Sequence, residues 1–157
     1  MSDTAQQLRA LLTAERGTLK TLEVALDAER EALGSANVEA LESATQSKRS
    51  AIQQQQERQQ ARGEFIDQAL GTNLSLSDAL ARLGNQDEDR ALGQEVIDLA
   101  KRCHEINRRN GTLILRQQDR TRSALDVLRG VDLSSDLYSL DGVLSNAASD
   151  SRSLGKA

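Results

Sequence analysis

Proline is missing from all 157 residues, and this absence constrains the fold more than any other feature of the sequence. Proline breaks helices and is common in turns, making up about 5% of ordinary globular chains. A chain of this length without it is expected to form long helices joined by few turns. The most abundant residues agree, because Ala, Leu, Glu, Gln and Arg all have high helix propensity.

The expected core is aliphatic. The chain has 24 leucines, no tryptophan, and only Phe65 and Tyr138 as aromatic residues. Its length suits a single domain. We therefore predict an all-α protein whose helices pack through leucine.

Glycines and one capping residue divide the chain into four expected helices. Gly34, Gly71, Gly84 and Gly130 each follow an apolar-periodic stretch, where helices commonly end in a left-handed residue. Asn37 is a good N-cap for the second helix. The expected helices cover residues 4–33, 37–70, 76–83 and 86–129.

Two of these helices carry heptad-like apolar stripes. In the first helix the stripe is Leu8, Leu12, Leu19, Leu22, Leu26 and Leu33, with Glu15 and Glu29 at the skipped positions. In the fourth helix it is Leu92, Val96, Leu99, Cys103, Ile106, Asn110, Leu113, Gln117, Arg120, Ala124 and Val127. Because short connections favour antiparallel neighbours, we predict an elongated antiparallel bundle of three long helices and one short helix over residues 1–129.

The middle of the second helix lacks apolar residues. Residues 53–60 read QQQQERQQ, and the apolar pattern returns only at Phe65. A helix that is polar all round is solvated or bridges to something else. We interpret this tract as a solvated rod beyond the packed core, with a polar interface as the alternative.

Residues 130–157 form the predicted C-terminal tail, where Gly, Ser and Asp become frequent. Within it, segment 131–145 is amphipathic, with leucines three or four residues apart at Leu133, Leu137, Leu140 and Leu144. Two interpretations remain open. The segment either docks back onto the bundle or is a helix that binds in the groove of a partner.

The sequence contains no recognisable set of catalytic residues. The lone cysteine and lone histidine, Cys103 and His104, are adjacent, so on a helix they point about 100° apart and cannot converge on one metal. No glycine-rich phosphate loop is present. We therefore expect a protein that is not an enzyme and needs no cofactor. Without a signal peptide or an apolar run of membrane-spanning length, we expect it in the cytoplasm, not inserted in a membrane.

Charge is unevenly distributed. The net charge of −4 argues against a general nucleic-acid binder, yet residues 101–129 hold eight basic and three acidic residues. Residues 1–100 carry a net charge of −7. One interpretation is that the basic fourth helix pairs with the acidic first helix. The other is that it presents a basic face to an acidic partner or a phosphate.

A glycine inside the fourth helix needs a reason, because Gly costs about 1 kcal/mol relative to Ala at such a position. This residue is Gly111, and it follows Asn110 on the predicted apolar stripe. A close helix approach, an asparagine that sets the helix register, and a local kink are all compatible with the pair.

The stretch from Ile106 to Ile114, INRRNGTLI, resembles the N-x-x-N-G-x-L-I motif of the FlgN family, with matching residues Asn107, Asn110 and Gly111. Residues 125–130 resemble the end of the corresponding helix in that family. Tyr138 and Gly142 then resemble its tail pattern of a tyrosine, three residues and a glycine.

This resemblance implies a flagellar type III export chaperone. Such a protein binds the C-terminal helices of the hook–filament junction proteins FlgK and FlgL and delivers them to the export gate protein FlhA. The resemblance places client binding in the tail and docking at the gate on Tyr138. Within the tail, we expect the client to contact the apolar residues of segment 131–145, which are Val131, Leu133, Leu137, Leu140 and Leu144. The alternative is a structural coiled-coil adaptor that uses the basic face of the fourth helix.

Overall fold

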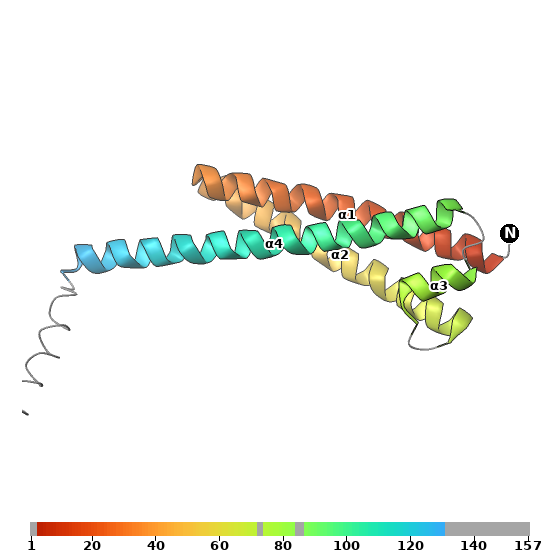
Figure 1. Ribbon diagram of the computed structural model, residues 1–157. Helices are drawn as coiled ribbons and strands as arrows, with labels where there is room; N and C mark the ends of the chain where they lie inside the picture. Colours follow the sequence, from red (N-terminus) through yellow and green to blue (C-terminus); the bar gives the residue numbers. More distant parts are fainter. Residues whose placement is uncertain (1–2, 72–73, 84–86, 131–157) are drawn as a thin grey trace, which may run out of the picture. The chain divides into compact units, whose positions relative to one another are not determined.

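A computed structural model of the chain describes residues 3–71, 74–83 and 87–130 (Figure 1). The prediction of an all-α fold is confirmed, since the described residues form helices and no strand. The helices are α1 (Asp3–Ser35), α2 (Val38–Leu70), α3 (Leu76–Leu83) and α4 (Asp87–Leu128). Their bounds lie within two residues of those predicted from the sequence.

Most of the predicted helix ends are also observed. Asn37 is the N-cap of α2, and its side-chain oxygen accepts a hydrogen bond from the Ala40 N–H at 3.0 Å. Gly71 ends α2 with a φ of 100°, and Gly130 follows α4 with a φ of 68°. Gly84 lies outside the described residues.

The predicted end of α1 at Gly34 is wrong, because the helix continues through this glycine to Ser35. The left-handed residue is instead Ala36, with a φ of 52°. The reason lies in the next residue, since Asn37 caps α2 while its N–H bonds back to the Ala32 carbonyl at 3.2 Å. The chain therefore reverses direction within a single residue, Ala36, which lies between the end of α1 and the N-cap of α2.

The chain divides into two compact units, residues 1–114 and 115–157. In the first unit, α1 and α2 form an antiparallel hairpin, shown by the ion pairs Glu29–Lys48 and Glu15–Arg62. Helix α4 runs parallel to α1. The three long helices therefore run up, down and up, and α2 is antiparallel to both of its neighbours.

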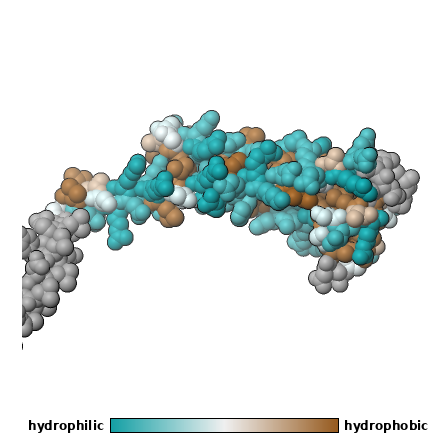
Figure 2. All heavy atoms as spheres, in the orientation of Figure 1, coloured by the Kyte–Doolittle hydropathy of each residue, from teal (hydrophilic) through white to brown (hydrophobic). Residues whose placement is uncertain are grey.

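Leucines of α1 form the centre of the core. All six residues of its predicted stripe are buried, and all but Leu33 belong to one core cluster with Ala51 and Ile66 of α2 and with Val96 and Leu99 of α4. Hydrophilic residues cover most of the visible face of these helices, with apolar residues showing between them (Figure 2).

The short helix α3 packs against α4 at a glycine. A Cβ atom at Gly93 would lie only 2.1 Å from Cδ1 of Leu80, which is buried. This close approach explains why the helix contains glycine here despite its low helix propensity.

The glutamine tract is only partly a solvated rod. Most of residues 53–60 are exposed as predicted, but Gln55 is buried and donates to Glu15 Oε1 at 3.1 Å. Its own side-chain oxygen accepts from the Thr18 hydroxyl. The tract therefore passes through the bundle beside α1, where a buried carboxylate gives Gln55 a polar partner.

Across the described residues, no helix is both long enough and apolar enough to cross a membrane.

Candidate interaction surface

The residues predicted to bind the client and the gate all fall outside the described part of the chain. These are Val131, Leu133, Leu137, Tyr138, Leu140 and Leu144, and the family-motif residue Gly142 lies outside the described part as well. The site residues that the structure does place are Asn107, Asn110 and Gly111 of α4, and it gives them three different surroundings.

Asn110 is completely buried and joins α4 to α1. Its Nδ2 donates to the Leu26 carbonyl oxygen and to Glu29 Oε2, each at 2.9 Å. Its Oδ1 is buried and accepts no hydrogen bond within the described residues. Because a buried polar residue at a heptad position fixes the register of two helices, Asn110 is the register-setting asparagine among the explanations considered above.

The carboxylate that Asn110 contacts belongs to a polar layer across all three long helices. Glu29 is 1% exposed, and its Oε1 lies 2.6 Å from Nζ of Lys48 on α2. A second layer forms where Glu15 meets Arg62 and Gln55. Both carboxylates stand at the skipped positions of the α1 stripe, so acidic residues at heptad positions were the sequence signal for these layers.

Asn107, by contrast, is exposed and lines a groove between α2 and α4. The groove has a volume of about 280 Å³ and a floor formed by leucines of α1. His104 lines the same wall one turn earlier. This groove was not predicted from the sequence. Its signal was a second uncharged heptad stripe on α4, namely Ile97, Ala100, His104, Asn107, Gly111 and Ile114.

Gly111 follows Asn107 by one helical turn on this second stripe. A Cβ atom built there would have no neighbour within 4 Å among the described residues. Close approach of another helix of the described chain therefore does not explain this glycine.

The basic residues of α4 do not pair with α1 as the first charge interpretation proposed. Arg102 alone among those of residues 101–129 makes a described ion pair with α1, to Glu23 at 3.0 Å. The other ion pairs between these helices have the opposite polarity, with the basic residue on α1 and the acid on α4: Arg9 with Glu88 and Asp89, and Arg16 and Lys20 with Glu95. The reason is the parallel alignment, which places the acidic start of α4 beside the start of α1.

Two arginines of α4 share one acid within the helix. Glu105 accepts from Arg108 at 3.1 and 2.9 Å and from Arg109 at 2.8 Å. These hydrogen bonds lower the pKa of Glu105 to about 2. The three residues together carry a net charge of +1.

Cys103 is a buried packing residue, as expected from its position on the stripe. Its Sγ donates to the Leu19 carbonyl oxygen at 3.6 Å, and burial raises its pKa to about 11. A thiol with so high a pKa is a poor nucleophile at neutral pH. No group of three or more metal-ligating side chains occurs in the described ranges.

The second unit is described over residues 115–130, and none of these residues is buried. The predicted α4 stripe is buried or half-buried as far as Leu113, whereas Gln117, Arg120, Ala124 and Val127 are exposed. Large apolar side chains are exposed here as well, at 63% for Leu115 and 82% for Leu128. At this end of α4, large apolar side chains are therefore exposed, and no other part of residues 115–130 buries them.

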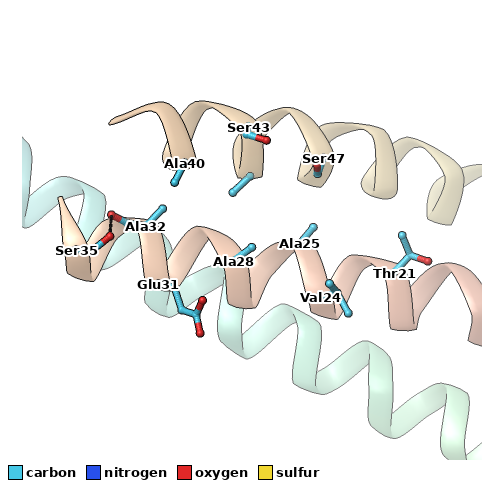
Figure 3. Close-up of a pocket in the computed structure, with 11 residues that line it drawn as sticks. Thr21, Val24, Ala25, Ala28, Glu31, Ala32, Ser35, Ala40, Ser43 and Ser47 are labelled. Atoms are coloured by element: carbon cyan, nitrogen blue, oxygen red, sulfur yellow. Dashed lines mark hydrogen bonds between the residues drawn. The ribbon is translucent and has the colours of Figure 1, made fainter. Parts of the chain in front are cut away.

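A second groove lies between α1 and α2, with a volume of about 560 Å³ (Figure 3). Its walls are mostly small side chains, among them Ala28 and Ala32 of α1 and Ala40 and Ser43 of α2. Because these side chains are small, they leave this space between the two helices open.

Long helices with an uncharged groove and exposed apolar side chains are typical of proteins that bind other helices. The comparison with protein families identifies the class more closely. The model of the FlgN protein family matches residues 1–146, so the chain belongs to the FlgN family of flagellar export chaperones. Members of this family bind flagellar hook-associated proteins. Comparisons with curated proteins and with solved structures found no match.

Proposed function

We propose that this chain binds the C-terminal helices of FlgK and FlgL in the cytoplasm, and that it delivers them to the export gate protein FlhA. It acts without catalysis. The observation that carries this proposal is the family match, which extends to residue 146 and so includes the leucines and the tyrosine of the tail.

In the proposed division of labour, residues 1–129 form the bundle and residues 130–157 form the tail. Val131, Leu133, Leu137, Leu140 and Leu144 of segment 131–145 contact the client, and Tyr138 docks at the gate. An amphipathic segment that orders on binding gives up about 2–5 kcal/mol of its interaction energy. This cost keeps the complex releasable, as export requires.

The experiment is co-purification of the full-length chain with C-terminal segments of FlgK and FlgL. We expect the double variant Leu137→Asp/Leu140→Asp to lose most of the bound client, because the charges would have to be buried against it. Leu154→Asp is the matched control, since it makes the same change outside segment 131–145. Equal recovery of client by the double variant and the control would refute the assignment of the tail.

Docking at the gate is tested separately. Tyr138→Ala should retain client binding and lose binding to purified FlhA. If Tyr138→Ala binds FlhA as well as the unmodified chain does, the tyrosine is not the docking residue.

A further inference from the structure

The groove between α2 and α4 has an apolar floor and uncharged walls. Leu19, Leu22 and Leu26 of α1 line its floor. Its walls include Ile52 and Gln59 of α2, and Ala100, His104 and Asn107 of α4. No carboxylate, ammonium or guanidinium group lines it.

Helix α4 therefore carries two heptad stripes. The first, with Val96, Leu99 and Cys103, is buried against α1. The second turns toward the groove, where Ala100, His104 and Asn107 are exposed. In helical bundles a helix with two stripes commonly contacts two neighbours, and over this exposed part of the second stripe the described residues supply no further helix.

Gly111 continues the second stripe and has open space around it. Alanine would fit there and has the higher helix propensity. A glycine in that position leaves room for the backbone of another helix to approach. A helix that packs at Gly111 therefore has to come from outside the described helices.

Helical spacing places three basic residues beside the groove. Lys101 and Arg108 lie three residues before and four residues after His104, so they share its side of α4. Arg49 stands three residues before Ile52 on the opposite wall. Arg108 shares Glu105 with Arg109, which leaves that cluster at +1, and neither Lys101 nor Arg49 has an ion pair within the described residues.

We propose that this groove receives an amphipathic helix whose leucine and alanine stripe is flanked by acidic residues. The apolar stripe covers the leucine floor, Gly111 allows the incoming backbone close to α4, and the acidic flanks face Arg49, Lys101 and Arg108. Taking that helix to be the terminal helix of an exported client rests on the function proposed above. The groove thus adds a second contact surface for the client, on the bundle itself.

The test uses the full-length chain and a synthetic three-heptad peptide with Leu and Ala on its apolar stripe and Glu at the flanking positions. Fluorescence anisotropy of the labelled peptide should show saturable binding. A peptide with the same stripe and Lys at the flanking positions should bind at least tenfold more weakly, because it meets the basic residues beside the groove.

Gly111→Leu is the decisive variant, and Gly17→Leu of α1 is its matched control. Both glycines lie inside helices, and at neither would a Cβ meet a neighbour, so both variants should fold, as circular dichroism would verify. We expect Gly111→Leu to weaken binding of the acidic peptide at least tenfold and Gly17→Leu to leave it unchanged.

The proposal is overturned if the acidic peptide fails to bind, if the Lys peptide binds equally well, or if Gly111→Leu has no effect. A client segment that binds the chain but does not compete with the peptide would also overturn it, while leaving the proposed function intact. Failure of every client segment to bind would instead count against the proposed function, and the peptide would still report on the groove.

Discussion

At the scale of single residues, buried carboxylates link each long helix to a neighbouring one through ion pairs. Glu15, Glu29 and Asp89 are each at most 6% exposed, and each lies beside a basic side chain of another helix. A buried ion pair adds little stability compared with an apolar pair of similar size, but removal of one partner leaves an uncompensated charge. Such pairs favour one alignment of the helices over others.

Lys48→Met should therefore destabilise the bundle by about 3 kcal/mol, because Glu29 would keep only Asn110 as a partner. Adding Glu29→Leu to Lys48→Met should recover much of this loss, since no unpaired carboxylate would remain buried at this position. Urea denaturation of both variants measures the difference. A double variant no more stable than Lys48→Met would contradict the argument.

The raised pKa of Cys103 predicts its reactivity. Because the thiolate is the reactive form, alkylation by iodoacetamide at pH 8 should be very slow in the folded chain and fast in denaturant. With a pKa of about 11 in the fold against 9.0 without it, the thiol contributes stability fully below pH 9. That contribution is lost as the pH rises through 11. Rapid alkylation of the folded chain at pH 8 would show that the thiol is not buried.

At the scale of the helix, three glycines have two different environments. Gly93 is pressed against Leu80 of α3, whereas Gly17 and Gly111 have open space around the missing Cβ. Helix propensity alone favours alanine at all three positions by about 1 kcal/mol. Only at Gly93 does packing oppose that preference.

Gly17→Ala and Gly111→Ala should each raise the free energy of unfolding by about 1 kcal/mol. Gly93→Ala should raise the free energy of unfolding by less than this, or should lower it, because its Cβ would displace the buried side chain of Leu80. Thermal denaturation followed by circular dichroism compares the three. If Gly111→Ala were destabilising, its open surroundings would be in doubt, and with them the space offered to an incoming helix.

At the scale of the whole chain, burial divides α4. Val96, Leu99, Cys103 and Asn110 are buried, while none of residues 115–130 is. Segments with few buried contacts open with low free energies. The two parts of this helix should therefore differ in local stability.

Amide hydrogen exchange should show strong protection over residues 96–110 and rapid exchange over residues 115–128. A client bound on the C-terminal part of the chain should slow exchange in residues 115–128, since it would cover their exposed leucines. Uniform protection along α4 in the free chain would contradict the division.

The sequence by itself determined the helices. The lack of proline, the heptad spacing of leucine and the cap at Asn37 are local properties, so they predicted four helices with nearly correct bounds. The motif around Gly111 also indicated the family, because a motif depends only on residue order and spacing.

Only the tertiary structure decided which residues face which neighbour. Heptad spacing placed Glu15 and Glu29 on the packed face of α1, but which side chains they meet there depends on which helix lies opposite, and helical periodicity does not contain that information. Which charged residues of α1 and α4 form ion pairs also depends on how the two helices are aligned. Once α4 lies parallel to α1, its acidic start meets the basic residues of α1, and Arg102 alone among the basic residues further along α4 makes a described ion pair with α1.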